Sequence, residues 1–302
     1  MPIYQVIVLA IVQGLAELLP VSSSAHVVVA EKLMGLDPSS PQMTLLLVML
    51  HTGTMFAVIA YFWSQWKQTY FASADAFKRF AVRVVWATAL TGIVGEALKV
   101  LIEHTAFKGA PKAEIEELFG RLDLIAPALA CAGVLILIAG LREKRLAAEA
   151  ETATSITRQS TDSVTMRQAG WIGFVQGLAL PFRGFSRSGS TISTGMLAGA
   201  TKQRAERFSF ALAVVLTPFI VAEETRRLLK DLHQRAAAGM SVNLHQAFIP
   251  SLEGMFFSFL AGLVALRVLS RVLELGKWWV FGLYCLMASG VIWYLHFGPR
   301  HL

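Results

Sequence analysis

Charged residues are scarce in this sequence. They make up 16% of its 302 residues, whereas a soluble protein usually has about 25%. Hydrophobic residues account for 55% and the mean hydropathy is +0.56, so polar side chains are too few to cover a surface that faces water. The composition excludes a disordered chain, a collagen and a coiled coil, and it argues against a soluble enzyme. We therefore predict an integral membrane protein.

Cysteine is rarer still, with two residues in the whole chain. Cys131 and Cys285 lie inside apolar stretches and neither belongs to a CxxC pair, so the sequence predicts no disulfide framework and no thiolate metal site. Basic residues are missing from the start of the chain, where the first is Lys32. A cleavable signal peptide needs such residues, and we therefore expect the N-terminus to be mature sequence.

The few charges are biased towards positive ones. The formal net charge is +7 and the pI is 9.6, which in a soluble domain would suggest nucleic acid as a partner. In a membrane protein, basic cytoplasmic loops and anionic lipid headgroups explain the same bias. We predict membrane lipids, and not nucleic acid, as partners.

Six apolar stretches are long enough to cross a bilayer, since a spanning helix needs about 20 residues. They cover residues 43–63, 82–102, 122–141, 207–222, 248–270 and 278–297. An outer-membrane barrel would instead show alternating segments of about 10 residues. The predicted fold class is an all-α integral membrane protein with about six transmembrane helices.

Two further apolar regions are interrupted by polar residues. Residues 3–35 are broken at 19–26 (LPVSSSAH), and residues 169–200 are broken at 181–191 (PFRGFSRSGST). Backbone groups exposed at membrane depth must be buried in protein or line a wet cavity, so no helix continues straight through either break. Each region is predicted to be a re-entrant helical hairpin with a polar tip.

The two interrupted regions are related to each other. The segment VQGLA occurs at residues 12–16 and again 163 residues later, and the same offset aligns Ser23 with Ser186. Three expected spans separate the regions, so the second copy enters from the opposite face, which is an inverted-topology repeat with a shared site near the midplane. We predict a single membrane domain over residues 1–302, with repeats at 1–141 and 168–302 and a solvated linker at 142–167.

The basic residues predict the orientation. With the N-terminus outside, 15 lysines and arginines fall on the inner side and 10 on the outer side, when the two arginines of the second break are left aside. Because basic residues favour the cytoplasmic side of a membrane, we expect both termini to lie outside.

Charged side chains gather at the two breaks, where lipid makes each of them costly by about 2.5–3.5 kcal/mol. They are Glu17, His26, Arg183 and Arg187. Seven hydroxyl residues accompany them: Ser22, Ser23, Ser24, Ser186, Ser188, Ser190 and Thr191. Charges at shallow tips can also reach water, and small hydroxyl residues also serve helix packing. Charged and hydroxyl residues nevertheless occur together at both breaks, which favours a functional site.

Arginine, serine and glycine together are suited to binding a polyanion. Guanidinium groups bind phosphate oxygens in pairs, hydroxyls donate further hydrogen bonds, and the N-terminus of each outgoing helix adds backbone N–H groups. Gly184 and Gly189 allow the backbone to approach closely. Beside Arg187, we predict a phosphate-binding set made of Ser22, Ser24, Arg183, Ser186, Ser188 and Thr191.

A carboxylate and an imidazole next to this set indicate a reaction. Glu17 would repel phosphate unless it holds a divalent cation or orients a base, and His26 can act as an acid, a base or a nucleophile. Ser23, three residues before His26, is the best candidate for an attacking hydroxyl or a substrate ligand. With Arg187, these residues predict phosphoryl transfer to water at the membrane interface.

Both breaks resemble the signatures of a known family. Gln13-x-x-x-Glu17 followed by residues 19–26 resembles the first signature of the bacitracin-resistance type undecaprenyl-diphosphatases. Residues 184–191 resemble the second signature, Pro-Gly-x-Ser-Arg-Ser-x-x-Thr, and weaker similarities occur at 50–54 and 208–213. The resemblance covers nearly the whole chain.

The resemblance implies an enzyme of the bacterial inner membrane that removes the terminal phosphate of undecaprenyl diphosphate. The product is the monophosphate lipid carrier that peptidoglycan synthesis reuses, and a divalent cation, Mg or Ca, supports the reaction. By position, Glu17 is the carboxylate of the acidic motif and the metal ligand, His26 is the motif histidine, Ser23 is a nucleophile or ligand, and Arg187 binds phosphate. Both termini would then be periplasmic, and the oligomeric state stays open, with a homodimer as one alternative.

Two positions depart from the family's pattern. Position 13 is a glutamine, so only Glu17 carries charge in the acidic motif, and Arg183 stands where a proline is expected before Gly184. We therefore interpret the chain as a divergent member. The alternative function is a carrier of a polyprenyl phosphate or a related anion, because inverted repeats with broken helices are transporter architecture. Glu17 and His26 favour the enzyme, since a uniporter needs neither.

His51, within the first expected span, is equally compatible with a packed role and with lining the site. Glu96 has Lys99 three residues further on, which favours a local ion pair.

Overall fold

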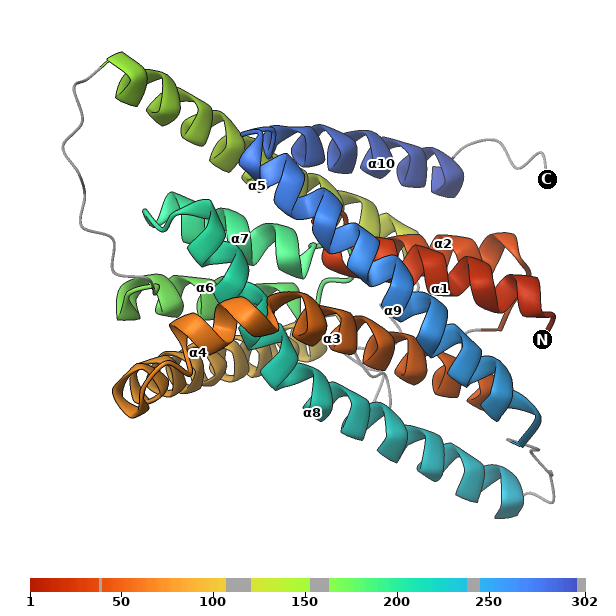
Figure 1. Cartoon of the computed structure of the whole chain (residues 1–302). Helices are drawn as coiled ribbons and strands as arrows, with labels where there is room; N and C mark the ends of the chain where they lie inside the picture. Colours follow the sequence, from red (N-terminus) through yellow and green to blue (C-terminus); the bar gives the residue numbers. More distant parts are fainter. Residues whose placement is uncertain (38–39, 107–120, 153–162, 238–244, 298–302) are drawn as a thin grey trace. The chain divides into compact units, whose positions relative to one another are not determined.

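The computed structural model describes residues 1–37, 40–106, 121–152, 163–237 and 245–297. Within these ranges all regular secondary structure is helical, as the sequence predicts (Figure 1). The helices are α1 (Ile3–Leu18), α2 (Ser23–Leu33), α3 (Pro41–Thr69), α4 (Ala74–Ala106), α5 (Leu122–Thr152), α6 (Met166–Ala179), α7 (Arg187–Leu197), α8 (Lys202–Ala237), α9 (His245–Glu274) and α10 (Trp279–Phe297).

Six of these helices, α3, α4, α5, α8, α9 and α10, are long and apolar enough to cross a membrane. Five of them contain a whole expected stretch, and α10 contains the sixth stretch except for residue 278. The prediction of about six spans is therefore confirmed. The helices extend beyond the apolar stretches into the connectors. In particular, α5 continues to Thr152, so the first part of the expected linker is helical, and residues 153–162 lie outside the described part.

Large apolar side chains cover the outside of the spanning helices. Val85 and Ile93 of α4 are 67% and 66% exposed, and Met287 of α10 is 66% exposed. Water would make such a surface unfavourable, whereas lipid tails would not. The chain is accordingly a multi-pass membrane protein.

Short helices flank both breaks. In the first, Leu19 is extended (φ −74°, ψ 151°), as a residue before a proline prefers, and α1 therefore ends one residue earlier. Helices α1 and α2 pack together, as do α6 and α7. Both breaks are shorter than expected, because α2 already begins at Ser23 and α7 at Arg187. His26, Ser188 and Thr191 consequently lie on helices and not in the tips.

The chain divides into two compact units, which are described separately below. Unit 1 contains Met1–Leu19, Ser23–Trp63 and Ala213–Leu269, and unit 2 contains Pro20–Ser22, Ser64–Leu212 and Ser270–Leu302. Three helices, α3, α8 and α9, therefore contribute residues to both.

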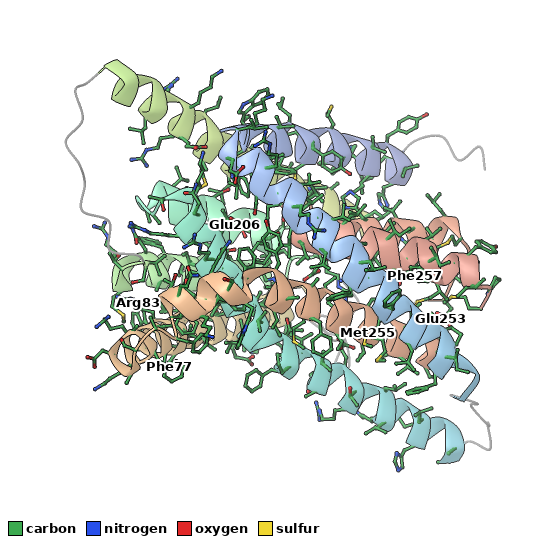
Figure 2. The ribbon with its side chains drawn as sticks, viewed as in Figure 1. Phe77, Arg83, Glu206, Glu253, Met255 and Phe257 are labelled. Carbon is green, nitrogen blue, oxygen red and sulfur yellow. The ribbon has the colours of Figure 1, made fainter. Side chains whose placement is uncertain are left out.

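The core of unit 1 forms where α1, α2 and α3 meet. Val6, Leu9 and Ala10 of α1, Val27 of α2, and Met43, Leu46 and Leu50 of α3 are buried together. Helix α9 also packs closely on α1, because a Cβ atom at Gly14 would lie 2.5 Å from Cβ of Ala261 and 2.7 Å from the carbonyl oxygen of Ser258. A second close contact joins α9 to α3, where a Cβ atom at Gly53 would clash with the carbonyl group of Met255. Met255 on α9 is labelled in Figure 2.

Unit 2 is built around two helix pairs, α5 with α10 and α4 with α6. In the α4–α6 pair, a Cβ atom at Gly177 would lie 2.7 Å from Cβ of Val94 and 2.8 Å from the carbonyl oxygen of Thr91. In the α5–α10 pair, the hydroxyl of Ser289 donates a hydrogen bond to the carbonyl oxygen of Ala126 (2.7 Å). Small residues at these crossings let the backbones approach, which is how helices associate in lipid.

Candidate functional site

The turn between α1 and α2 has an unusual backbone. Ser22 has a φ of 67°, and among the described residues it is the one residue other than glycine with a positive φ. This left-handed conformation is unfavourable for a side chain with a Cβ atom, and residues held in it tend to cluster at functional sites. The chain thus turns at Ser22, and α2 begins at the next residue, Ser23.

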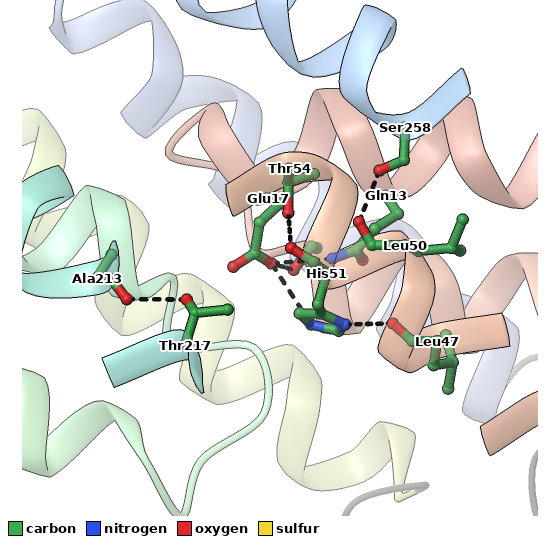
Figure 3. Close-up of polar contacts among 10 residues, drawn as sticks. Gln13, Glu17, Leu47, Leu50, His51, Thr54, Ala213, Thr217 and Ser258 are labelled. Atoms are coloured by element: carbon green, nitrogen blue, oxygen red, sulfur yellow. Dashed lines mark hydrogen bonds and ion pairs between the residues drawn. The ribbon is translucent and has the colours of Figure 1, made fainter. Parts of the chain in front are cut away.

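Glu17 lies in the last turn of α1, and several polar side chains converge on its Oε2 (Figure 3). The hydroxyl of Ser23 donates a hydrogen bond to this oxygen across the turn. The amide of Gln13, one helical turn earlier, donates another to it (3.3 Å). His51 of α3 approaches the same oxygen, with its Nε2 atom 4.0 Å away. The carboxylate is thus the centre of a polar group in unit 1.

The tautomer of His51 follows from its second contact. Its Nδ1 atom lies 2.8 Å from the carbonyl oxygen of Leu47, and because a carbonyl group only accepts, Nδ1 carries the hydrogen. In the neutral ring, Nε2 is therefore the atom with the free lone pair, and it faces Glu17 (Figure 3). The ring is held by its own helix, with its Nε2 atom facing the carboxylate.

The remaining predicted residues of the first break lie in the first turn of α2. Ser24 and His26 are half-buried, and His26 is three residues after Ser23, which places both on one face of the helix. The N-terminal N–H groups of a helix also attract anions. The start of α2 therefore brings together serine hydroxyls, an imidazole and a helix N-terminus, and Ser23 connects it to Glu17.

The second predicted group belongs to unit 2 and surrounds the start of α7. Ser186 is the N-cap, and its Oγ atom accepts a hydrogen bond from the backbone N–H of Gly189 (3.2 Å). Arg187 is the first helical residue and is half-buried, as is Arg183. The chain reaches this position through Gly184, whose φ is 110°. A Cβ atom there would clash with the carbonyl group of Ile125, so only glycine fits.

The hydroxyl residues that follow Arg187 are buried. Ser190 and Thr191 donate hydrogen bonds to the carbonyl oxygen of Arg187, at 3.1 Å and 2.7 Å. Their hydrogens are thus used within the helix, and their oxygens keep free lone pairs. Ser188 is also buried. Ser188 and Thr191 stay predicted phosphate ligands, and Thr191 would have to redirect its hydroxyl hydrogen from Arg187 in order to donate to a phosphate.

One contact links the two breaks directly. Pro20 of the first break belongs to unit 2, and a Cβ atom at Gly189 of α7 would lie 3.1 Å from Cβ of Pro20. The thiol of Cys285 on α10 donates to the carbonyl oxygen of Pro20 (3.3 Å). The tip of the first break is thus packed against the start of α7.

The donor groups allow one kind of metal site. In the described ranges, no group of three or more His, Cys, Asp and Glu residues is arranged to hold a metal ion. A catalytic Mg²⁺ ion, however, is commonly bound by one or two carboxylates and by the phosphate oxygens of the substrate. Glu17 next to Ser23 supplies one carboxylate and a hydroxyl, which fits a divalent cation that binds together with a diphosphate.

Two residues of this site could not be assigned from the sequence. His51 was compatible with either role, and the structure places it beside Glu17. Ser258 of α9 donates a hydrogen bond to the carbonyl oxygen of Leu50 (2.9 Å), the residue before His51. It lies 208 residues away in an ordinary apolar helix, so no local signal distinguishes it.

Comparison with known proteins identifies the family of the chain. The family model described as bacitracin resistance protein BacA matches residues 6–291. The chain is 52% identical to undecaprenyl-diphosphatase 2 of Acinetobacter baylyi over 97% of both chains. It is 32% identical to undecaprenyl-diphosphatase 2 of Burkholderia ambifaria, over 96% of this chain and 95% of the relative. Undecaprenyl-diphosphatase 1 of Burkholderia pseudomallei matches at the same identity and coverage. The chain therefore belongs to the bacitracin resistance protein BacA family.

Proposed function

We propose that the protein is an undecaprenyl-diphosphatase, which hydrolyses undecaprenyl diphosphate to undecaprenyl phosphate and inorganic phosphate. Membership of the family and the 52% identity to a relative of that name support the assignment. Within the structure of this chain, the main observation in support of the function is the hydrogen bond from Ser23 to Glu17. A hydroxyl that donates to a carboxylate is a nucleophile next to its base.

In this proposal the Oγ atom of Ser23 attacks the terminal phosphorus while Glu17 takes its proton. The bond between that phosphorus and the bridging oxygen breaks, and undecaprenyl phosphate leaves with the electron pair. Water then attacks the phosphoserine, releases inorganic phosphate and restores the hydroxyl. His26, on the same face of α2 as Ser23, is suited to moving a proton to the leaving oxygen or from the incoming water.

The second group of residues would bind the charge of the diphosphate. Arg187 offers a guanidinium fork, which matches phosphate oxygens in pairs, and Ser186 and the first N–H groups of α7 lie beside it. Ser22, Ser24 and Arg183 would add donors. A divalent cation, Mg or Ca, held by Glu17 and the substrate oxygens, would neutralise part of the charge during transfer.

Helix lengths support the proposal that both interrupted regions are re-entrant hairpins. With 1.5 Å per residue, the 16 residues of α1 span about 24 Å and the 14 residues of α6 about 21 Å. The 11 residues of α2 and of α7 span about 16 Å each. All are shorter than the hydrocarbon core of a bilayer, which is about 30 Å thick.

The inverted repeat is supported by two matching helix crossings. In unit 1, Gly14 meets the carbonyl oxygen of Ser258 and Cβ of the residue three positions later, and in unit 2, Gly177 meets the carbonyl oxygen of Thr91 and again Cβ three positions later. Gly14 and Gly177 are the central residues of the repeated VQGLA segments. In the repeats at 1–141 and 168–302, α1 and α6 would then be equivalent helices that pack through the same face. Each hairpin would pack on a helix of the other repeat.

The location we propose is the bacterial inner membrane. Both termini would lie in the periplasm, because this orientation places more of the basic residues on the cytoplasmic side. The lipid substrate would reach the site from the surrounding membrane.

Phosphate release by the purified protein tests the function. The protein in detergent, supplied with undecaprenyl diphosphate and Mg²⁺ or Ca²⁺, should release inorganic phosphate, and Ser23→Ala should abolish the release. Rapid acid quenching should recover a phosphorylated Ser23 peptide from the wild type. A wild-type protein that binds the lipid and releases no phosphate would contradict the enzyme and favour a carrier. Release without any phosphopeptide, together with an active Ser23→Ala variant, would point to direct attack by water.

A further inference from the structure

We propose that the start of α4 binds an anionic phospholipid, whose phosphate group contacts Arg83 and Arg79. The inference goes beyond the proposed function and does not depend on it. Both arginines belong to unit 2 and lie at the end of α4 where its expected apolar stretch, residues 82–102, begins. Phospholipid headgroups meet a spanning helix at this level, and in the orientation proposed above it belongs to the cytoplasmic leaflet.

Arg83 has a hydrogen-bond donor that is buried and not used within the described residues. Its Nε atom is buried and has no hydrogen-bond partner in that part of the chain. The side chain as a whole is only half-buried, so its guanidinium group can be reached from outside, and Arg83 is labelled in Figure 2. A charged group that is removed from water without an acceptor is unfavourable. A bound anion would supply that acceptor.

The charges around Arg83 also favour an anion. Burial removes water from its guanidinium group, and Arg79, one helical turn earlier, adds the repulsion of a like charge. Among the described residues, neither arginine forms an ion pair with a carboxylate. A phosphate group that contacts both guanidinium groups would offset this repulsion and accept charged hydrogen bonds from them.

Helix α6 brings a further basic residue to the same level. A Cβ atom at Gly170 of α6 would lie 2.9 Å from Nε1 of Trp86, and the next contacts between the two helices continue in the same direction along both. Arg167 is three residues before Gly170, as Arg83 is three residues before Trp86. Arg167 is exposed in the first turn of α6. It therefore adds to the attraction of this surface for an anionic headgroup.

The surface next to these arginines is apolar on both helices. Val82, Val85 and Trp86 of α4 are exposed. Trp171 and Phe174 of α6 are also exposed, with 5.9 Å between their ring centroids. Acyl chains pack against such a surface, whereas a soluble anion would gain nothing from it. Basic residues followed by an exposed apolar face fit a phospholipid, with its phosphate at the arginines and its chains along α4 and α6.

The melting temperature of the delipidated protein in a neutral detergent tests the proposal. Phosphatidylglycerol should raise it by about 3 °C or more, because a ligand of the folded state stabilises that state by mass action. Phosphatidylcholine with the same acyl chains, and inorganic phosphate at the same concentration, should each raise it by less than half as much. An equal shift with either of them would overturn the assignment to an anionic phospholipid.

Variants locate the site. Arg83→Gln should lose at least half of the shift that phosphatidylglycerol produces in the wild type. The matched control is Arg145→Gln, which removes the same charge from an exposed position of α5, on the cytoplasmic side in the proposed orientation, and should keep the whole shift. A full shift in Arg83→Gln, or equal losses in both variants, would contradict a site at the start of α4.

Native mass spectrometry measures the binding of phosphatidylglycerol directly. We expect Arg83→Gln to raise the dissociation constant about fivefold or more, and Arg79→Gln, at an exposed position, to raise it about threefold. Arg83→Lys should also weaken binding about threefold, since lysine keeps the charge but loses the guanidinium fork. An Arg83→Lys variant that binds as tightly as the wild type would overturn the contact with the guanidinium group. If the wild type released no phosphate, the proposed function would fall, and these binding constants would still decide whether the lipid site exists.

Discussion

The hydroxyl of Thr91 on α4 donates a hydrogen bond to the carbonyl oxygen of Gly173 on α6, at 2.9 Å. The same hydroxyl also bonds to the carbonyl oxygen of Ala87 in its own helix (2.8 Å). Thr91 is buried, and no side chain at position 173 separates the two backbones. A polar contact between two helix backbones therefore holds the second hairpin on α4.

Gly173→Ala should destabilise this crossing, because the new Cβ atom would clash with the backbone of Ala87. Overpacking of this kind costs about 1–3 kcal/mol, and we expect the melting temperature in detergent to fall by roughly 5 °C or more. The control is Gly290→Ala in α10, where a Cβ atom would meet nothing within 4 Å. Equal melting temperatures for both variants would contradict the close packing.

Glu17→Gln should remove the proton acceptor and keep the size of the side chain. Loss of a general base costs about 10²- to 10⁴-fold in rate, and phosphate release should fall by that factor. The melting temperature should stay close to that of the wild type, since the amide still accepts the hydrogen bond of Ser23. Substantial activity in this variant would mean that another group accepts the proton.

Arg187→Lys should separate charge from geometry at the start of α7. A lysine keeps the positive charge but cannot bind two phosphate oxygens with a planar fork, so we expect kcat/KM to fall about 10- to 100-fold, with each lost charged hydrogen bond costing about 1.5–3 kcal/mol. Arg142→Lys is the control. That guanidinium donates to the carbonyl oxygen of Leu197 at the other end of α7 (3.0 Å), and the change should leave phosphate release unchanged.

Gly184→Ala should inactivate the enzyme, because its backbone has a φ of 110° and a Cβ atom has no room beside Ile125. Gly199→Ala separates the effect of the positive φ from the effect of the missing space. Gly199 also has a positive φ, 88°, but a Cβ atom there would meet nothing within 4 Å. We expect the Gly199 variant to lose about 1–2 kcal/mol of stability from strain and to remain active. Similar losses of phosphate release in both would show that the space around Gly184 is not the cause.

Removal of divalent cations should abolish phosphate release. EDTA should stop the reaction, and added Mg²⁺ or Ca²⁺ should restore it, if Glu17 and the diphosphate bind the ion together. Isothermal titration provides a second readout: the lipid should bind more weakly after EDTA treatment in the wild type, with a smaller difference in Glu17→Gln. A wild-type rate that does not respond to EDTA would exclude the cation from the reaction.

The spanning helices were predictable because length and hydropathy determine them. Each expected span corresponds to a helix, although α3 begins earlier, at Pro41, and continues to Thr69. Polar residues such as Gln65 and Lys67 end the apolar stretch but do not end the helix, since backbone hydrogen bonds continue beyond the lipid. The helix ends, unlike the spans, depend on local features such as Pro20 and the Ser186 cap.

The candidate site was predictable only in part. Glu17 and Ser23 could be identified because Ser23 lies in the first break and Glu17 just before it, where lipid disfavours polar groups. The contacts of His51 and Ser258 could not, because they depend on how α3 and α9 pack against α1. A histidine or serine in an apolar helix carries no local sign of its neighbour 34 or 208 residues away.

The crossing of Gly14 with Ser258 also bears on how the protein is made. The partner of α1 is encoded about 240 residues after it, which at 5–20 residues per second corresponds to roughly 12–50 s of synthesis. During that time the first hairpin is already translated but lacks the helix that buries Gly14. Until α9 emerges, the face of α1 at Gly14 must therefore be covered by lipid or by the insertion machinery.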